Sequence, residues 1–269
     1  MRRAVVVVSL VAAILLFLWF APAAVFDVAV AIAAVLATHE LYAMFDVANG
    51  QRFLYAIGLL AAVGLVAQMA LLPAATLGVS VALFVMFVLT IVAFTTKRPG
   101  PTELLQALVV ILGVLYVPLM LGQVVWIRAS EHGREWVAII VATIFTREIS
   151  AHFAGKLLPA GKPLNAHINQ YKSYTGAIAG AAAAAVAALC ASRYFNVGAT
   201  AAGALVFGAC VGLACQLGDF AESYLKRVAG VRHSGTILGP EGGVLDFLDA
   251  ASFAILTARL LLFAMRRLQ

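Results

Sequence analysis

Residues 76–95, TLGVSVALFVMFVLTIVAFT, form an apolar stretch without a single charged side chain. An α-helix rises about 1.5 Å per residue, so a stretch of this length crosses roughly 30 Å, the thickness of the hydrocarbon layer of a bilayer. Backbone groups inside lipid must find their hydrogen-bond partners within the protein, and a helix supplies them within its own segment. The stretch therefore predicts a membrane-spanning helix.

Similar runs recur along the whole chain, which has 269 residues, 64% of them hydrophobic and only 11% charged. A water-soluble domain of this size could not bury so much apolar surface, so the composition excludes that class. We expect an all-α, polytopic membrane protein with about nine spans, at residues 4–22, 25–44, 53–72, 76–95, 104–126, 136–155, 175–191, 200–218 and 246–265. The first span starts like a signal peptide, but a second span follows at once, which favours an uncleaved helix.

Lysine and arginine are unevenly distributed between the loops on the two sides of the membrane. Cytoplasmic loops of membrane proteins carry the excess of these residues. If the N-terminus lies inside the cell, most lysines and arginines fall on the cytoplasmic side, which then also holds loops 156–174 and 219–245. Arg266 and Arg267 would in that case lie outside. We therefore expect a cell inner-membrane protein whose two long polar loops, and the polar cleft between them, face the cytoplasm. The net charge of +6 suits anionic lipid headgroups, and we expect no nucleic-acid partner.

The chain divides by chemistry near residue 135. Residues 1–135 form an N-terminal set of transmembrane helices with few polar side chains, and residues 136–269 form a C-terminal region that holds the candidate catalytic residues. Glu40 is an exception in the first region, because it lies late in the second span, where an ionised side chain is costly. We favour the interpretation that Glu40 caps a neighbouring helix, and a functional role is the alternative.

The sixth predicted span ends in TREISAHFAGK, residues 146–156. Glu148 and His152 are four residues apart, so on a helix they share a face and can point together into a polar cavity. The alternative is that Arg147 and Glu148 simply pair with other helices. Three ionisable residues within six positions of a span favour the cavity.

The following loop, LLPAGKPLNAHINQYKSYTG at residues 157–176, contains donors and no acid. Lys162, His167 and Lys172 make it suited to holding phosphate groups, because a lysine offers a compact positive charge with three donors. Basic loops beside membranes also serve only to set topology, so this loop carries little weight by itself.

Residues 216–250, QLGDFAESYLKRVAGVRHSGTILGPEGGVLDFLDA, concentrate charge between two apolar runs. One helical stripe extends the eighth span into the cytosol, because its members fall at offsets 0, 3, 4, 7 and 8; they are Asp219, Glu222, Ser223, Lys226 and Arg227. A glycine-rich stretch follows, and the chain then enters a helix with Asp246 and Asp249 on one face.

Two separated groups of acids that face one cleft, with basic side chains around them, are typical of a site for a divalent cation and phosphates. Oxygen ligands suit Mg²⁺, which takes one or two carboxylates and lets substrate phosphates complete its shell. Glycines let backbone amides approach a ligand closely, and a helix N-terminus favours an anion. The alternative is a salt-bridged cytoplasmic loop without a ligand.

This stretch resembles the signature of the phosphatidate cytidylyltransferases, also called CDP-diacylglycerol synthases. Their pattern runs Gly-Asp, Glu-Ser, Lys-Arg, four residues, Lys-Asp-Ser-Gly, Pro-Gly-His-Gly-Gly and Asp-Arg-x-Asp. The chain matches it at Gly218-Asp219, Glu222-Ser223, Lys226-Arg227, Ser234-Gly235, Gly242-Gly243, Asp246 and Asp249. Upstream, the chain is similar to the family in the spacing of Glu148 from Gly155-Lys156, and in Lys172-Ser173 before Gly176.

Six of the compared positions depart from the family pattern. Arg232-His233 stands for Lys-Asp, Glu241 for histidine, Phe247 for arginine, Asn169 for serine and Glu148 for aspartate. The family has an acid at the position of His233 and a histidine at the position of Glu241. This chain therefore keeps one carboxylate and one imidazole at the same spacing, with their positions exchanged. One hypothesis is that these two side chains hydrogen-bond and close the loop over a nucleotide; drift of two solvent-facing residues is the alternative.

The resemblance implies transfer of a cytidylyl group from CTP to phosphatidate in the bilayer, with Mg²⁺ as the cofactor and a homodimer left open. It implies Asp219 and Asp246 as metal ligands, with Asp249, Lys172, Lys226 and Arg227 completing the catalytic set. The substrate-binding residues it implies are Glu148, Lys156, Ser223, Arg232, His233, Glu241, Gly242 and Gly243. Two alternatives remain: an inactive homologue that binds a lipid or a partner, and a transporter with Glu40, Glu148 and His152 along its path.

Overall fold

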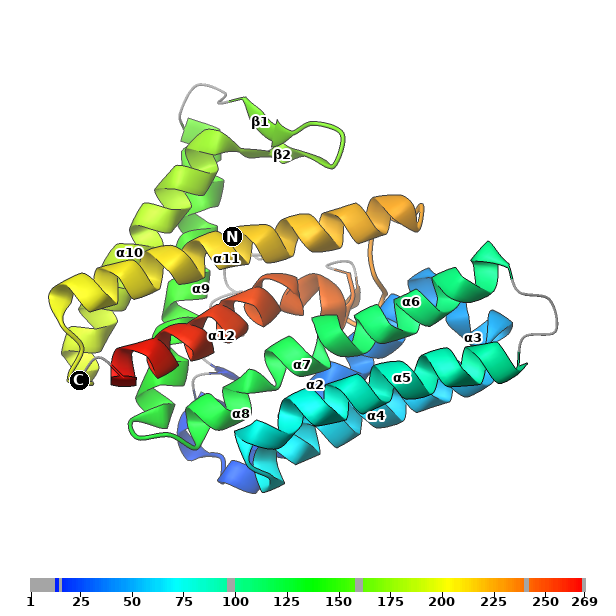
Figure 1. Cartoon of the computed structure of the whole chain (residues 1–269). Coiled ribbons are helices and arrows are strands. Elements are labelled where there is room, and N and C mark those ends of the chain that lie inside the picture. The colour runs from blue at the N-terminus through cyan, green and yellow to red at the C-terminus, as the bar shows by residue number, and fades with distance from the viewer. Residues whose placement is uncertain (1–12, 15, 96–99, 158–161, 240–241, 268–269) are drawn as a thin grey trace.

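The computed structural model is helical, with one small hairpin, and describes residues 13–14, 16–95, 100–157, 162–239 and 242–267 (Figure 1). The long helices are α2 (Ala23–Met44), α4 (Arg52–Leu71), α5 (Leu77–Thr95), α6 (Pro101–Tyr116), α9 (Gly133–Leu157), α10 (Tyr174–Phe195), α11 (Ala201–Val228) and α12 (Val244–Arg267). The short elements are α3 (Val47–Gly50), η1 (Ala74–Thr76), α7 (Pro118–Leu121), α8 (Gln123–Arg128), β1 (Pro163–Asn165) and β2 (Asn169–Ser173).

Eight helical segments among the described residues are long and apolar enough to cross a membrane. Each of them coincides with one of the predicted spans from the second to the ninth, so the all-α polytopic class is confirmed. The first predicted span, residues 4–22, lies mostly outside the described residues, and its uncleaved helix therefore stays a prediction, as does the total of nine. The multi-pass membrane character follows from these helices.

The predicted span at 104–126 is broken into α6, α7 and α8. Pro118 has no backbone N–H to donate to the carbonyl oxygen four residues earlier, so the helical hydrogen-bond ladder is interrupted there, although Val117 keeps right-handed helical angles (φ −96°, ψ −64°). Pro101 lies in the first turn of α6, where a missing N–H costs nothing because that group has no partner within the helix.

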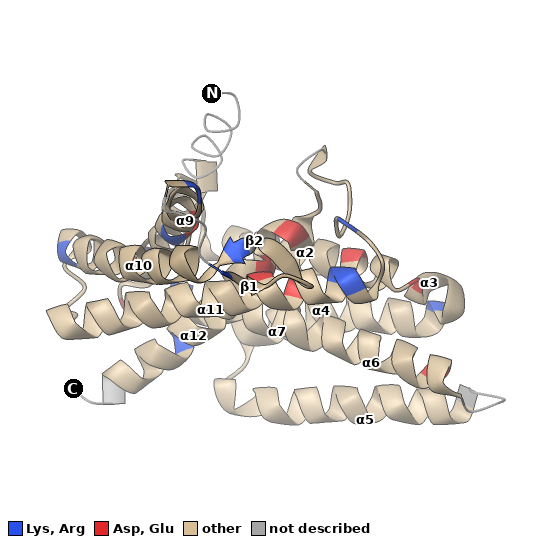
Figure 2. Cartoon of the chain, turned by 90° about the horizontal axis from the view of Figure 1, so that it is seen from above, with Lys and Arg blue, Asp and Glu red and all other residues tan. Residues whose placement is uncertain are grey.

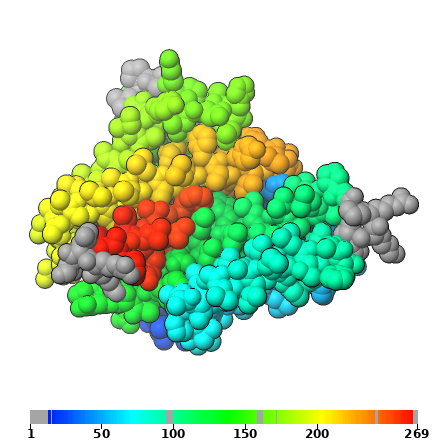
Figure 3. Space-filling view, viewed as in Figure 1, coloured from blue at the N-terminus to red at the C-terminus, as the bar shows by residue number. Residues whose placement is uncertain are grey.

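Helix α12 lies at the centre of the bundle, between α11 and the α6–α8 segment (Figures 1 and 3). It also packs against α2 from the N-terminal region. At Gly218 of α11 the two backbones come so close that an added Cβ would lie less than 3.0 Å from the carbonyl oxygen of Asp249. The absence of a side chain at Gly218 therefore sets how closely α11 and α12 approach each other.

The loop between α9 and α10 forms a β-hairpin, in which β1 pairs with β2 in the antiparallel direction. The sequence predicted only a polar loop here, because a two-stranded hairpin leaves little periodicity to detect. Ser173 ends β2 and caps α10, since its hydroxyl accepts a hydrogen bond from the backbone N–H of Gly176 at 3.1 Å. The hairpin therefore returns the chain directly into α10.

Gly218→Ala should lower the melting temperature of the protein in detergent. The added methyl has to push apart two backbones, which costs about 1–3 kcal/mol. Gly64→Ala is the matched control, because nothing lies within 4 Å of its Cβ position and alanine favours the helix. Equal melting temperatures for the two variants would show that the close approach at Gly218 is not required.

Candidate active site

Four carboxylates gather where the C-terminal part of α11 meets the first turns of α12. Asp219 and Glu222 come from α11, and Asp246 and Asp249 come from α12; at most about a tenth of each is exposed. Their cationic partners come from three elements, with Arg147 on α9, Lys172 on β2 and Lys226 on α11. Figure 2 shows these charges gathered around β2 and the adjoining helices, whereas α5 at the edge of the molecule has none.

Asp219 is neutralised by two cations on the same carboxylate oxygen. Arg147 donates from Nη1 to Oδ2 at 2.7 Å, and the ammonium of Lys172 pairs with this same Oδ2. The other Arg147 terminal nitrogen, Nη2, donates to Oε1 of Gln216 at 2.6 Å. Arg147 is only 2% exposed, and a buried charge has to be paired. Arg147 thus pairs with another helix, as in the alternative interpretation, whereas Glu148 lines the pocket described below.

Asp246 is held in the first turn of α12 by four donors. Lys226 donates from Nζ to Oδ1 at 2.6 Å. Oδ2 accepts from the backbone N–H groups of Ser234 and Gly243 at 2.9 and 2.8 Å, and from the Ser234 hydroxyl at 3.0 Å. Lys226 also pairs with Glu222, so one ammonium bridges an acid from each helix. The predicted stripe is confirmed as one face of the continuous helix α11.

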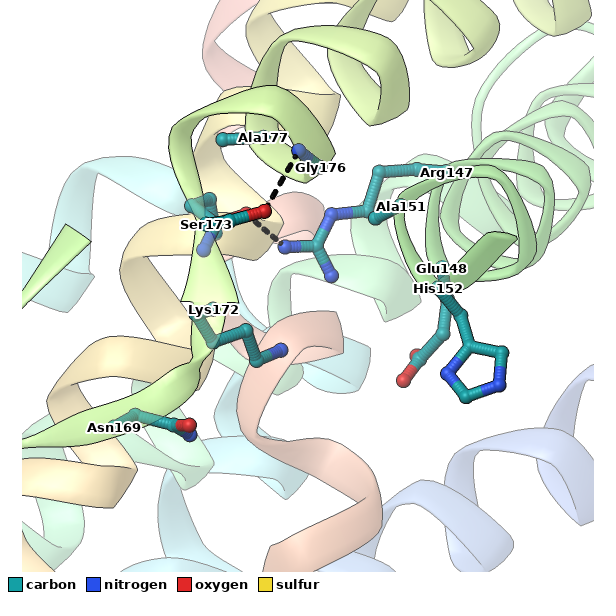
Figure 4. A pocket seen from close by; sticks show the side chains of 10 residues that line it. Arg147, Glu148, Ala151, His152, Asn169, Lys172, Ser173, Gly176 and Ala177 are labelled. Atoms are coloured by element: carbon teal, nitrogen blue, oxygen red, sulfur yellow. Dashed lines mark hydrogen bonds between the residues drawn. The ribbon is translucent and has the colours of Figure 1, made fainter. Parts of the chain in front are cut away.

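A polar pocket of about 250 Å³ opens beside Asp219, between α9, β2 and the start of α10. Its lining includes Arg147, Glu148, His152, Lys172 and Gln216 (Figure 4). Glu148 and His152 extend from the same face of α9, as their spacing predicted. The expected polar cavity is therefore present, with Lys172 on its opposite wall.

The hairpin is attached to α11 through two further predicted residues. Asn169 donates from Nδ2 to the hydroxyl of Ser223 at 3.2 Å, and Arg227 donates from Nε to the carbonyl oxygen of Ile168 at 3.3 Å. Both contacts lie outside the carboxylate cluster. Ser223 and Arg227 therefore place the strand that carries Lys172.

Three further predicted residues lie at the edge of the site. Lys156 is exposed in the last turn of α9, and Arg232 and His233 are exposed in the loop before α12. His233 approaches Asp246 to 3.9 Å, measured from Nδ1 to Oδ2. Glu241 lies outside the described residues, so its proposed exchange with His233 stays a prediction.

Gly242 and Gly243 are buried just before α12. Gly242 has a φ of +111°, a conformation that a residue with a side chain rarely adopts. An added Cβ on Gly243 would overlap the carboxylate of Glu40. Gly242 is therefore needed for the backbone conformation, and Gly243 is needed for packing against Glu40. The close approach of their backbone amides to a ligand stays a prediction.

Glu40 of α2 caps α12, as favoured from the sequence. Its carboxylate accepts from the backbone N–H groups of Val244 at 3.0 Å and Leu245 at 2.8 Å. The anion expected at this helix N-terminus is therefore provided by the chain itself. Glu40, Arg147 and Gln216 were not among the site residues predicted from the sequence. Glu40 and Arg147 could have been found, because a charged side chain within an apolar span is itself a signal of a functional or paired group.

The Mg²⁺ ion expected at the carboxylate cluster, with substrate oxygens completing its shell, stays a prediction. No group of three or more histidine, cysteine, aspartate or glutamate side chains in the described residues is arranged to hold a metal alone. Oxygen donors are nevertheless the ligands that Mg²⁺ prefers, with one or two carboxylates sufficing. Oε1 of Glu222 is buried without a hydrogen-bond partner, which leaves one acceptor open within the cluster.

Fold and site together define a polytopic helical membrane protein with a cluster of acids and bases where α9, β2, α11 and α12 meet. The family model described as "Cytidylyltransferase family" matches residues 1–265, so the chain belongs to this family.

Several curated relatives share about half of the chain. A phosphatidate cytidylyltransferase of Helicobacter pylori strain J99 is 36% identical over 131 residues, 48% of this chain and 46% of the relative. A phosphatidate cytidylyltransferase of Brucella abortus biovar 1 is 35% identical over 125 residues, 46% and 45% of the two chains. One of Mycobacterium bovis is 29% identical over 136 residues, 50% and 44%. The chain spans about half the length of the curated relatives it matches.

Arg147→Met should destabilise the protein by about 3 kcal/mol, because the buried Asp219 then keeps only the partly exposed Lys172 as a partner. Thermal unfolding in detergent measures the loss. Adding Asp219→Asn to Arg147→Met removes the uncompensated charge and should recover most of the stability. A double variant as unstable as Arg147→Met alone would show that packing of the arginine, and not its charge, stabilises this site.

Proposed function

We propose that the protein transfers a cytidylyl group from CTP to phosphatidate, forming CDP-diacylglycerol and pyrophosphate. The observation that supports this most directly is the cluster of four acids and three bases, which adjoins a polar pocket within a membrane-embedded bundle. Membership of the cytidylyltransferase family and the names of the relatives support the same reaction.

The reaction needs two anionic substrates to meet at one phosphorus atom. A phosphate oxygen of phosphatidate attacks the α-phosphorus of CTP, and the bond to the β-phosphate breaks, so pyrophosphate leaves with the electron pair. A phosphate monoester is largely ionised at neutral pH, because its second pKa is about 6, and a strong general base is not required. The main demand on the protein is therefore to hold and neutralise phosphate oxygens.

Lys172 and Lys226 are the residues suited to that task. Both are partly exposed and both pair with carboxylates, so they can exchange a carboxylate oxygen for a phosphate oxygen. Lys172 also lines the pocket, which supports a contact between its ammonium and a phosphate of the nucleotide. Arg147 is buried and stays with Asp219.

Asp219 and Asp246 would hold the Mg²⁺ ion, with Glu222 and Asp249 beside them. The ion would supply charge neutralisation of the triphosphate when bound. The apolar helices around the cluster leave the acyl chains of phosphatidate in lipid while its headgroup reaches the site. We place this site on the cytoplasmic face of the inner membrane, because the distribution of basic residues favours it.

The test is a transfer assay with purified protein in detergent, Mg²⁺, labelled CTP and phosphatidate. We expect labelled CDP-lipid from the wild-type protein, and none from Asp219→Asn or Asp246→Asn at limiting Mg²⁺. Melting temperatures establish that both variants remain folded. If the wild-type protein is inactive, the alternative of a homologue that only binds a lipid or a partner is favoured. Wild-type-like activity in Asp219→Asn or Asp246→Asn would refute the assignment of that aspartate as a metal ligand.

Lys226→Ala should raise the KM for CTP or for phosphatidate at least about tenfold. A hydrogen bond between charged groups is worth about 1.5–3 kcal/mol, and about 1.4 kcal/mol corresponds to a factor of ten. Arg52→Ala is the control, because Arg52 is an exposed cation at the start of α4, away from the cluster. If both substrate dependences stay unchanged in Lys226→Ala, its ammonium serves only to pair Glu222 with Asp246.

A further inference from the structure

Glu40 is the one acid of the N-terminal helices in the described residues that hydrogen-bonds the loop and helix carrying Asp246. It is 3% exposed, although it carries a carboxylate within an apolar helix. Burying a charge in such a position is costly unless hydrogen bonds replace its hydration. The backbone N–H groups of Val244 and Leu245 and the Ser234 hydroxyl at 3.0 Å provide that replacement.

Ser234 links Glu40 to Asp246. Its hydroxyl oxygen lies 3.0 Å from Oε2 of Glu40 and 3.0 Å from Oδ2 of Asp246. The same oxygen accepts from the backbone N–H of Asp246 at 3.2 Å. A hydroxyl has a single proton to donate, so it serves one of the two carboxylates at a time. The position and the hydrogen bonding of Asp246 therefore depend on where Glu40 lies.

The loop before α12 is shaped around the Glu40 carboxylate. An added Cβ on Gly235 would lie 2.5 Å from Oε1 of Glu40, and one on Gly243 would overlap the same carboxylate. The described parts of the loop on both sides of residues 240–241 thus enclose this one side chain. Removing the carboxylate would leave a cavity and unpaired amides next to Asp246.

We infer that Glu40 is a positioning residue of the active site, which fixes the N-terminus of α12 and the Ser234 loop so that Asp246 faces the other acids. This inference rests on the proposed function, because Asp246 is assigned there as a ligand of the reaction. A residue that only caps α12 would not need to be linked to Asp246, because a serine, threonine or aspartate directly before the helix is enough to cap it. The link through Ser234 adds the positioning role.

The test compares Glu40→Ala, Glu40→Gln and Ser234→Ala with the wild-type protein in the transfer assay. We expect kcat to fall at least about tenfold in Glu40→Ala, in line with the loss of hydrogen bonds to a charged group, and less in Glu40→Gln, which keeps one acceptor oxygen. The Mg²⁺ concentration for half-maximal rate should rise, whereas the KM for phosphatidate should stay within about twofold. Asp27→Asn, at the opposite end of α2, is the matched control and should change none of these values.

Two further measurements separate positioning from general stability. In a double-mutant cycle, the variant that combines Glu40→Ala with Ser234→Ala should be about as active as the less active of the two single variants, because both substitutions break the same link. Hydrogen exchange of residues 242–250, measured without substrate, should accelerate in Glu40→Ala while α9 is unaffected. If Glu40→Ala fails to fold, Glu40→Gln and Ser234→Ala carry the test.

The outcomes distinguish the inference from the proposed function. Glu40 and Ser234 variants with wild-type kcat and wild-type Mg²⁺ dependence would overturn the inference, even if their melting temperatures fall, and Glu40 would then be a cap only. Strictly additive losses in the cycle would overturn it as well. A wild-type protein that makes no CDP-lipid would reject the proposed function itself, and the inference with it.

Discussion

The pairing of Arg147 with Asp219 is the interaction on which the site depends. It joins α9 to α11 through a contact of 2.7 Å between two almost fully buried charges. Both side chains are almost fully buried, so the charge of Arg147 is tolerable because Asp219 is present, while Asp219 is paired with Lys172 as well. The pair fixes α9 against α11, and the hairpin between α9 and α10 then places Lys172 on the same carboxylate. The second pair of acids is brought in by α12, whose approach to α11 is allowed by Gly218.

Three of the four carboxylates of the cluster are paired with cations of the same chain, whereas the fourth, Asp249, accepts a hydrogen bond from the backbone N–H of Ala250. Lys226 bridges Glu222 and Asp246, Asp219 has two cations, and the N-terminus of α12 has the carboxylate of Glu40. Pairing within the chain lowers the cost of holding these charges in a low-dielectric bundle without a bound ligand, and the buried Asp249 is the acid of the cluster left without a cation in the described residues. Under the proposed function, binding of a phosphate would be an exchange of partners, in which the cost of separating a lysine from its carboxylate is offset by new contacts with phosphate oxygens.

Much of this arrangement could be predicted from the sequence. Apolar runs located all eight segments of the described residues that are long and apolar enough to cross a membrane, because the length of a span is set by the thickness of the bilayer. The helical spacing of Asp219 and Lys226, and of Glu148 and His152, predicted which side chains share a face. Contacts between distant segments had no such local signal. Glu40 and Leu245 are far apart in sequence, and only the packing of α2 against α12 brings them together. The β-hairpin was missed because its strands are short and polar.

The two cations on Asp219 differ in how they are held. Arg147 comes from the interior of a long helix and is 2% exposed, whereas the Lys172 side chain comes from a hairpin strand and is 28% exposed. Asp219 therefore has one permanent counter-ion and one exchangeable counter-ion. Withdrawal of Lys172 leaves the carboxylate neutralised by the guanidinium, so the hairpin can release and recapture its lysine without stranding a buried charge. The energetic barrier for opening this wall of the pocket is then set by the contacts of a small hairpin, and not by the stability of the membrane bundle.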